Sequence, residues 1–451
     1  MKKIWVIILQ NVKIKNDIDG LIILDKEKNM TSNDCLMILK KVLHVDKIGH
    51  IGTLDPNATG VLICLVGRAT KSQEYLMRTG DKVYSAEIVF GISTDTEDIT
   101  GNIINISDDL NEKINTLKKE SFNKENQESR SIIDEKIVNI KNKFSNVIDR
   151  FIGEYEQVPP MYSAKKIEGK KLVDLARKGK IVERKPSKVK INNIALNDIK
   201  YECKSIKGMN TKLYVGRIIV NCGKGTYIRT LCKDIGDAMG IPTCMGELQR
   251  TRVFNFDIKD SIKINEIKEK VEKNDYSFIK PCYYRDDNTV LTFGKFETLH
   301  LGHMKIIENV VKYAREGQYK SVAMIVGDNV DNQVLTKEQR ISKFKYLGID
   351  DIINFKLNEI NKKISPEEFV KDILINQLKA KMIIVGSDCS FGYKGMGDAR
   401  LLKNLCKESN VDVIVVDKLK IMGTNDDISS TFIKSEYDKG NKELVAKLLG
   451  K

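Results

Sequence analysis

What the sequence lacks excludes several kinds of site. Its nine cysteines are scattered with no CxxC pair, so neither a zinc site nor a disulfide framework is indicated. No apolar run reaches transmembrane length, and the run after Met1-Lys2-Lys3 is too short for a signal peptide. We therefore expect reduced, mostly buried cysteines in a cytoplasmic protein with no membrane partner. There are only four histidines, so a histidine inside a motif is informative.

The rest of the composition is that of a globular protein with a basic surplus. The 451 residues are 41% hydrophobic and 31% charged, with a formal net charge of +14. This length suffices for two or three domains, each with its own core. A positive surplus suits a polyanion, because each neutralised phosphate releases counterions. The same surplus is common in lysine-rich proteomes, so charge alone leaves the partner open.

A glycine-rich segment at residues 49–60 (GHIGTLDPNATG) lies between two apolar runs. Gly and Asn adopt turn dihedrals that other residues resist, so this segment is predicted to be a loop that leaves and re-enters a sheet. Asp55 precedes a proline, which biases it to extended geometry and limits where its carboxylate points. Taken alone, the loop is also consistent with a turn-initiating Asp55 and a partly buried ring at His50.

Motifs in and around this loop resemble the TruB type of tRNA pseudouridine synthase. The matching segments are Leu24–Lys26, Met30–Ser32, Gly49–Leu62 and Gly67–Lys71. The resemblance implies that Asp55 is the catalytic residue, which acts without a metal or organic cofactor on the uridine at position 55, in the T-loop of tRNA. The departures from the family are Ile51 for the usual threonine and Glu27 for the usual proline.

The same resemblance gives roles to two aromatic rings. Residues 82–90 alternate well enough to predict a strand. Tyr84 in this strand aligns with the tyrosine that stacks on the target base, whereas a packing tyrosine with its hydroxyl at the surface is the alternative. Because the target base must leave its stack to be reached, His50 would fill or brace the vacated position.

The segment Lys165–Lys190 is rich in basic residues: it contains eleven Lys or Arg and three acidic residues. This ratio favours phosphate contact over a merely solvated face. A helix around Leu172 and Ala176 would leave Arg177 to project, and the resemblance pairs Arg177 with the catalytic aspartate. Leu175 stands where the family commonly has a tyrosine that touches the substrate.

A second glycine-rich turn, residues 223–226, follows a predicted strand and precedes a predicted helix. Its spacing does not satisfy the P-loop motif, but it matches a synthase signature that shapes the floor of the active site. The resemblance implies RNA contacts for Tyr227 and Arg229, and also for Lys26. For Arg229, a structural role and a substrate-positioning role are equally open.

The synthase resemblance covers residues 20–265. Residues 1–19 precede it as an N-terminal extension. Residues 102–146, approximately, are an insertion longer than the family leads us to expect, too polar to fold by itself and therefore exposed. Bacterial members usually carry a small RNA-binding domain after residue 265, and no room for it remains. A charged helix and a proline-containing connector at 266–287 form the expected linker.

Residues 288–451 show a different pattern. Val290–Phe293 is predicted to be a buried strand, and His300–His303 opens a helix whose apolar residues recur at helical spacing from Ile306 to Ala314. Two histidines at a helix N-terminus can hold an anion, because free backbone N–H groups and the helix dipole add to the imidazole donors. A metal pair or two core histidines are the alternatives.

The motif Thr292–His303 resembles the nucleotidyltransferases, specifically the FMN adenylyltransferase (FAD synthetase) half of the bacterial bifunctional riboflavin kinase/FAD synthetases. The resemblance implies adenylyl transfer from ATP to FMN with Mg²⁺ neutralising the phosphates, and no kinase activity. Glu297-Thr298 replaces the usual Asp-Gly. The histidines would hold the leaving phosphates, and the 430–434 segment would close over them. The implied nucleotide-binding residues are Gly294, Phe296, His300, His303, Asp388, Ser430, Thr431 and Lys434.

We therefore expect a two-domain α/β (α+β) protein, with a mixed-sheet pseudouridine synthase domain followed by a Rossmann-like, doubly wound parallel-sheet nucleotidyltransferase domain. The expected partners are tRNA, through its T-arm, and ATP and FMN, with no metal site and no protein partner implied. Two alternatives stay open. The chain could be a tRNA-binding or tRNA-folding module with a degenerate nucleotide-binding appendage, or its second domain could use another acceptor, such as an alcohol in cytidylyl-type transfer.

Overall fold

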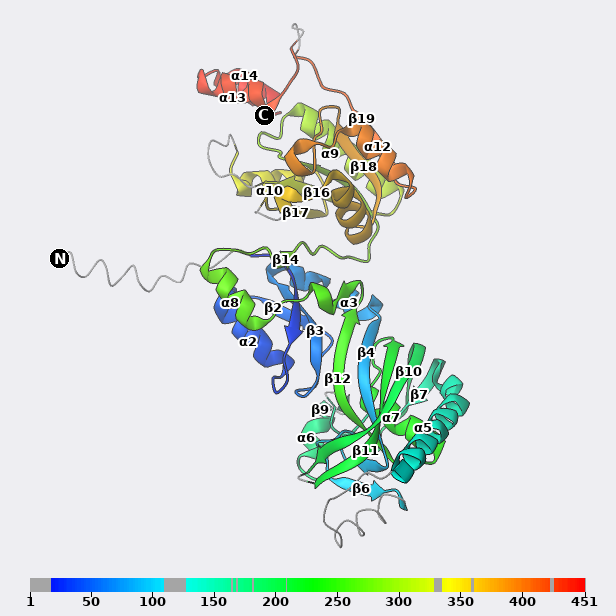
Figure 1. The fold of residues 1–451 in the computed structure, drawn as a ribbon. Coiled ribbons are helices and arrows are strands. Elements are labelled where there is room, and N and C mark those ends of the chain that lie inside the picture. The colour runs from blue at the N-terminus through cyan, green and yellow to red at the C-terminus, as the bar shows by residue number, and fades with distance from the viewer. Residues whose placement is uncertain are drawn as a thin grey trace, which may run out of the picture. The chain divides into compact units, whose positions relative to one another are not determined.

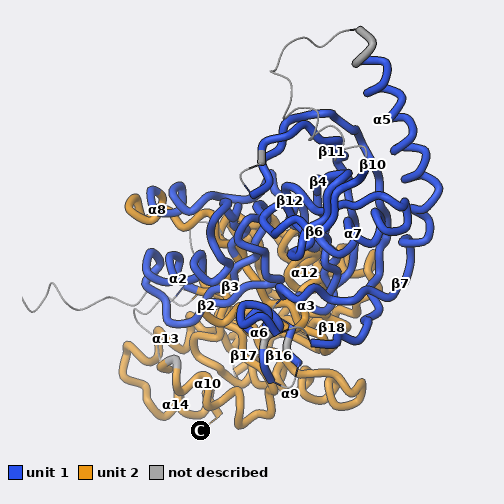
Figure 2. Tube along the Cα trace, turned by 90° about the horizontal axis from the view of Figure 1, so that it is seen from below, with its two compact units in different colours: residues 1–18, 22–66, 76–269 blue, residues 19–21, 67–75, 270–451 orange. Residues whose placement is uncertain are grey.

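The computed structural model describes residues 18–108, 127–163, 165–167, 169–180, 182–207, 209–327, 335–357, 361–421 and 426–450. These residues form two compact units. The first consists mainly of residues 22–66 and 76–269 and the second mainly of residues 270–451 (Figure 2). In the described part of the chain, no helix is both long enough and apolar enough to cross a bilayer. The N-terminal extension lies almost wholly outside the described residues.

The first unit is built on one mixed sheet (Figure 1). Strands β3 and β12 are parallel, whereas β12, β4, β11, β10 and β7 are antiparallel neighbours. The predicted strand at 82–90 is β4, and the expected mixed sheet is therefore present. In sheet order the strands are β1 (Gly20–Lys26), β3 (Thr59–Val66), β12 (Thr243–Val253), β4 (Lys82–Phe90), β11 (Met209–Cys222), β10 (Ser187–Ile206) and β7 (Gly153–Gln157).

Helices and short strands complete this unit. β2 pairs with β3, β13 pairs with β12, and two small hairpins are formed by β5 with β6 and by β8 with β9. The additional elements are α2 (Ser32–Leu43), β2 (Ile48–Ile51), α3 (Gln73–Thr79), β5 (Ile92–Thr94), β6 (Ile103–Ile106), α5 (Gln127–Ile148), β8 (Lys166–Ile167), β9 (Lys170–Lys171), α6 (Leu172–Ala176), α7 (Ile228–Met239), β13 (Phe256–Asp257) and α8 (Ile264–Glu272).

Helix α5 corrects the expectation of a wholly exposed insertion. Residues 127–146 of that insertion are helical, and Ile140, Phe144 and Val147 are buried. These apolar residues recur at three- and four-residue intervals, so one face of the helix packs on the unit while the other remains in water. Residues 109–126 of the insertion lie outside the described residues.

The second unit contains a five-stranded parallel sheet. Its strand order is β17 (Asp351–Phe355), β16 (Lys320–Val326), β15 (Thr289–Gly294), β18 (Ala380–Gly386) and β19 (Asp412–Val416). The chain thus starts at the central strand and winds outward in both directions, which is the doubly wound arrangement. The predicted Rossmann-like fold is therefore present.

Helices cover both faces of this sheet. Val290 packs in one core cluster and its neighbour Leu291 in the other, as expected for a strand buried on both sides. The predicted helix is α9 (Leu301–Glu316), and its buried residues are those expected from the sequence. The other elements are β14 (Ile279–Lys280), α10 (Lys337–Tyr346), α11 (Pro366–Glu368), the π-helical segment Phe369–Gln377, α12 (Ala399–Lys407), α13 (Ser430–Asp438) and α14 (Lys442–Leu448).

Candidate active sites

A buried lysine holds the Asp55 loop from one side. The side chain of Lys26 is fully buried, and its Nζ donates hydrogen bonds to the carbonyl oxygens of Glu27, Pro56 and Ala58 at 2.9, 3.1 and 2.6 Å. Burial lowers the pKa of Lys26, and a buried ammonium must bond its hydrogens to be tolerated. The expectation that Lys26 contacts RNA is therefore wrong, because this ammonium is used on the loop that carries Asp55.

A buried arginine holds the loop from the sheet. Arg250 on β12 is fully buried and donates from Nε to the Val61 carbonyl at 2.7 Å and from Nη2 to the Gly52 carbonyl at 2.8 Å. Gly60 has a φ of +98°, and a Cβ there would lie 2.3 Å from the Arg250 carbonyl oxygen. Only glycine fits such a backbone conformation and approach. The sequence alone did not reveal this role for Arg250, although the loop glycines were an available signal.

Asp55 is paired with Arg229, in the first turn of α7. The Arg229 Nε lies 3.0 Å from the Asp55 Oδ2, and the side chains are 6% and 44% exposed. The remaining nitrogens of Arg229 donate to the backbone, from Nη1 to Thr96 O at 3.2 Å and from Nη2 to Tyr162 O at 2.9 Å. Asp98 is a second carboxylate, 3.7 Å from Nη1. Arg229 is thus fixed on all sides, and it fixes one oxygen of an accessible carboxylate.

This pair corrects the expected partner of Asp55. Arg177 follows the single-turn helix α6 and is exposed, as its predicted projection requires. However, the arginine that reaches Asp55 is Arg229. Arg177 stands in the basic segment and Arg229 follows the glycine-rich turn at 223–226, and the position of the α7 N-terminus beside the loop decides which of them reaches Asp55.

Tyr84 and His50 lie close to the same arginine of the sheet. Tyr84 is buried on β4, where it pairs with Arg250 across the β4–β12 register. Burial raises the pKa of Tyr84, the Arg250 charge opposes this rise, and the nearby Asp55 adds to it. His50 lies half-buried on β2, and burial together with the Arg250 charge lowers its pKa, so the ring is neutral near pH 7. The alternative of a surface hydroxyl for Tyr84 is therefore excluded.

The entrance to α7 is fixed by a side-chain amide whose role the sequence did not reveal. Gln157 is buried; its Oε1 accepts from the Tyr227 backbone N–H at 2.8 Å, and its Nε2 donates to the Tyr227 carbonyl at 3.1 Å. Tyr227 precedes the helix that carries Arg229 two residues later. Gln157 therefore positions the Asp55–Arg229 pair through the backbone.

The second unit has a cavity of about 910 Å³ at the carboxyl edge of its parallel sheet. The last residues of all the strands of this sheet line it: Gly294, Val326, Phe355, Gly386 and Val416. Ligands of doubly wound folds bind at this edge. Of the residues implied by the nucleotidyltransferase motifs, those in the lining are Gly294, Phe296, His300, His303, Asp388, Ser430 and Thr431.

The two histidines form a stacked pair at the start of α9. His300 is the N-cap residue, its Nδ1 accepts from the His303 backbone N–H at 3.4 Å, and the ring centroids lie 3.8 Å apart. Burial lowers the pKa of His300 to about 4 and that of His303 to about 3. Both rings are therefore neutral at pH 7 and can offer hydrogen bonds but no positive charge. The cationic side chains in the cavity lining are Lys295, Lys362, Lys363, Lys394 and Lys418.

Helix α13 is joined to the turn that follows β15. Ser430 and Thr298 share a hydrogen bond of 3.0 Å, and the Lys434 ammonium forms an ion pair with Glu297. Lys434 is absent from the cavity lining. In this structure Glu297 holds the charge of Lys434, and a phosphate contact by Lys434 stays a prediction. Glu297-Thr298, the departure from the usual Asp-Gly, supplies both contacts.

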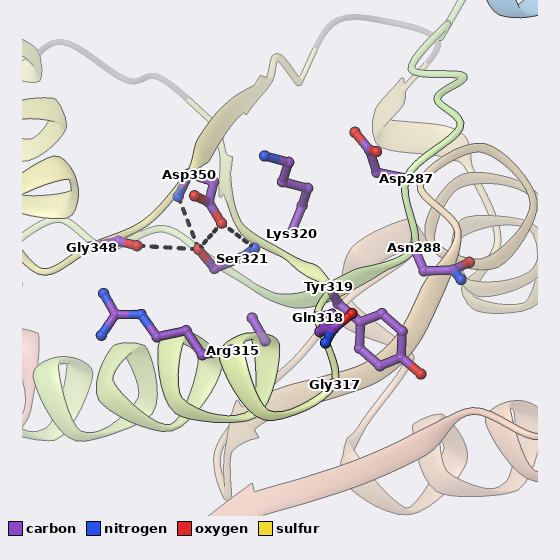
Figure 3. A pocket seen from close by; sticks show the side chains of 11 residues that line it. Asp287, Asn288, Arg315, Gly317, Gln318, Tyr319, Lys320, Ser321, Gly348 and Asp350 are labelled. Atoms are coloured by element: carbon purple, nitrogen blue, oxygen red, sulfur yellow. Dashed lines mark hydrogen bonds between the residues drawn. The ribbon is translucent and has the colours of Figure 1, made fainter.

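A further hollow of about 490 Å³ lies at the opposite, amino edge of the same sheet (Figure 3). There Asp350 Oδ2 accepts from the backbone N–H and the hydroxyl of Ser321, both at 2.8 Å, and the Asp350 N–H donates to Ser321 Oγ at 2.9 Å. These bonds join the starts of β16 and β17. Arg315 and Lys320 line this hollow and are exposed, so we assign its polar groups to stability rather than to catalysis.

Comparison with known proteins identifies the first unit. A family model described as "TruB family pseudouridylate synthase (N terminal domain)" matches residues 40–129 and 114–228. The tRNA pseudouridine synthase B of Listeria welshimeri is 39% identical over 263 residues, which cover 58% of this chain and 75% of the relative. That of Endomicrobium trichonymphae is 39% identical over 251 residues, which cover 56% of this chain and 92% of the relative. The chain belongs to the TruB family.

This TruB family member carries two further matches. The model described as "tRNA pseudouridylate synthase B C-terminal domain" matches residues 229–283, which span the end of the expected synthase domain and most of the expected linker. The model described as "FAD synthetase" matches residues 283–432. The chain is thus an enzyme in which a pseudouridine synthase, an isomerase, is joined to a nucleotidyltransferase domain of the FAD synthetase type. The solved structure titled "Crystal Structure of a Cbf5-Nop10-Gar1 Complex" is 23% identical, covering 65% of this chain and 67% of its own, with a TM-score of 0.38.

Proposed function

We propose that the first unit isomerises the uridine at position 55 in the T-loop of tRNA, with Asp55 as its catalytic residue. The observation that carries this proposal is the accessible Asp55 carboxylate, which Arg229 fixes beside Tyr84. Its loop is held by two buried cations, Lys26 and Arg250. The basic segment around α6 supports a polyanionic substrate.

In this proposal each group has one task. The target base leaves its stack to enter the site, and Tyr84 stacks on it there. Arg229 fixes the direction of one Asp55 oxygen by a charge-assisted hydrogen bond. The other oxygen then attacks the sugar or the base, or takes a sugar proton. In each case the bond from the sugar to the base nitrogen breaks, the base rejoins the sugar through a carbon atom, and the Asp55 carboxylate is released. His50, neutral at pH 7, braces the position that the base vacates. None of these tasks requires a metal or an organic cofactor.

Replacing Asp55 with Asn tests the assignment. The substitution keeps the size of the side chain and removes the carboxylate, so conversion of uridine in a transcript tRNA should fall below detection. The tRNA dissociation constant should change by no more than a few fold. Pseudouridine mapping and a filter-binding titration measure the two quantities. Retained turnover would remove Asp55 from its role, whereas wild-type protein that binds tRNA without converting it would favour the alternative of a binding or folding module.

For the second unit, we infer adenylyl transfer from ATP to FMN, giving FAD and pyrophosphate. An FMN phosphate oxygen forms a bond to the α-phosphorus of ATP, and the bond from that phosphorus to the β-bridging oxygen breaks. The cavity at the carboxyl edge of the sheet supports this inference. His303 Nδ1 is buried there and has no hydrogen-bond partner among the described residues, so it is available to a ligand.

Positioning and charge stabilisation supply most of the rate in phosphoryl-type transfer. His300 and His303 hold the leaving phosphates as neutral hydrogen-bonding groups, and the lysines of the cavity lining supply the positive charge. Mg²⁺ is typically held by one or two carboxylates together with substrate phosphates. Asp388 and Asp417 in the lining fit that requirement. The ion would neutralise phosphate charge.

The test is FAD formation by purified protein supplied with ATP, Mg²⁺ and FMN. His303→Ala should lower kcat/KM by about 10²–10³, the cost of losing one preorganised donor. Lys320→Gln, in the hollow at the amino edge of the same sheet, is the matched control and should keep the wild-type rate. The alternative is that this unit uses another acceptor. It would be established if the wild-type protein makes no FAD but transfers a cytidylyl group from CTP to an alcohol.

A further inference from the structure

A hollow of about 260 Å³ in the first unit, distinct from the Asp55 site, combines basic and aromatic groups. Its lining residues come from the region where α5 packs beside α7 and β10, and Figure 1 shows these three elements. None of its described lining residues is acidic. The lining consists of Phe90, Gly91, Ser107, Lys136, Asn139, Ile140, Lys143, Tyr201, Lys212, Leu213, Tyr214, Gly240, Ile241 and Pro242.

One face of α5 borders the hollow. Lys136, Ile140 and Lys143 follow one another at intervals of four and three residues, so they lie along one stripe of the helix. Ile140 is buried, Lys136 is half-buried and Lys143 is exposed. Two ammonium groups therefore flank an apolar contact on one stripe of the helix.

The opposite wall is aromatic. The rings of Tyr201 on β10 and Tyr214 on β11 lie 4.7 Å apart between centroids, and Lys212 Nζ lies 5.9 Å from the Tyr201 centroid. Both tyrosines are half-buried. Aromatic side chains next to a basic groove are the usual combination for holding single-stranded nucleic acid, because every base has a face that can stack.

The backbone relates this hollow to the Asp55 site. Tyr84 and Phe90 are six residues apart on β4, so they share one face of the sheet. Arg229 lies in the first turn of α7, and Gly240 directly follows that helix. At 1.5 Å per residue, the helix separates the two positions by about 17 Å. That separation is the span of a few nucleotides.

We propose that this hollow binds one unpaired nucleotide of the RNA substrate outside the target uridine, with its base against the Tyr201 and Tyr214 wall and neighbouring phosphates on Lys136 and Lys143. The proposal rests on the proposed function of the first unit. It gives the α5 insertion a role in holding RNA, and it explains why basic residues line a hollow that lies away from the catalytic carboxylate.

The first test is the salt dependence of tRNA binding. Lys136→Gln/Lys143→Gln should weaken binding about tenfold at 0.1 M salt and reduce the slope of log K against log salt by about 0.7 for each lysine removed. Lys141→Gln is the matched control, because Lys141 is exposed on α5 but does not line the hollow, and it should leave both quantities nearly unchanged. Equal affinities and slopes for the double variant and this control would overturn the proposal.

The second test separates stacking from charge. Tyr201→Leu should weaken tRNA binding about tenfold without changing the salt slope, because a stacking contact is lost but no phosphate contact. Tyr201→Phe keeps the ring and should restore the wild-type affinity. A leucine variant that binds as tightly as the phenylalanine variant would show that no base stacks there, and matching melting temperatures would confirm that both variants are folded.

A competition experiment decides whether the bound nucleotide belongs to tRNA or is a free mononucleotide. UMP or AMP at millimolar concentration should not displace labelled tRNA, because one nucleotide lacks the flanking phosphates. Displacement that is lost in the Tyr201→Leu protein would assign the hollow to a free nucleotide and overturn the RNA proposal. All these measurements record tRNA binding alone. Failure of the wild-type protein to convert uridine would contradict the proposed function, but the binding measurements would still test the hollow.

Discussion

At the scale of single residues, the first site shows how similar side chains acquire different tasks. Arg177 lies in the basic segment around α6 and Arg229 follows a glycine-rich turn. Arg229 is 6% exposed against Asp55, whereas Arg177 is exposed to solvent. A guanidinium that bonds two backbone carbonyls as well as the carboxylate has a fixed orientation. The exposed guanidinium of Arg177 is free of that constraint on its orientation.

Substitution of the two arginines should therefore affect different kinetic constants. Arg229→Lys keeps the charge but loses the fork geometry, so kcat for pseudouridine formation should fall about 10²-fold. Arg177→Lys should change kcat less than twofold and act, if at all, on KM. Single-turnover kinetics with saturating tRNA separate the two effects. If kcat falls further in the Arg177→Lys variant than in the Arg229→Lys variant, Arg177 would be the arginine that pairs with Asp55 during catalysis.

At the scale of elements, the loop between β2 and β3 is shaped by its close contact with β12. Gly60 has a φ of +98° and no space for a Cβ beside the Arg250 carbonyl. Gly153 has the same φ of +98°, but nothing lies within 4 Å of the position that a Cβ would occupy there. The two glycines thus share one backbone requirement and differ in packing alone.

Alanine at these positions should separate backbone strain from steric contact. Gly153→Ala should lower the free energy of unfolding by about 1–3 kcal/mol, the usual cost of a left-handed non-glycine residue. Gly60→Ala should lower it further and also reduce kcat, because the clash moves the loop that carries Asp55. Thermal unfolding and pseudouridine formation measure the two effects. Equal destabilisation with full activity would show that the loop adapts without cost.

At the scale of the whole molecule, the two chemistries belong to separate units. The Asp55 pair lies entirely in the first unit, and the nucleotide cavity is lined only by residues of the second. Each unit has its own sheet and its own core. The two sites therefore share no catalytic residue, although both units belong to one chain.

Inactivation of one unit should accordingly leave the other active. Asp55→Asn should make FAD at the wild-type rate, and His303→Ala should form pseudouridine at the wild-type rate. Saturating ATP and FMN should change tRNA turnover by less than twofold. Parallel assays on both variants test this independence, and a loss of both activities in either variant would demonstrate coupling between the units.

The sequence by itself determined the elements whose signals are local. The alternation at 82–90, the apolar spacing in 306–314 and the glycines around Asp55 each predict their own backbone, because strand, helix and turn preferences act over a few residues. Motif resemblance added the two families, which the comparisons confirm. The roles of Asp55, Tyr84 and His50 remain predictions, and the structure places these residues around one loop and one buried arginine.

Only the tertiary structure decided which distant side chains meet. Arg229 reaches Asp55 from a remote part of the sequence, and Lys26 turns its charge to the backbone rather than to RNA. Local patterns cannot report such choices, because burial and pairing of a charge depend on every element that packs around it. The same reason explains why a polar-looking insertion became a helix with one buried face.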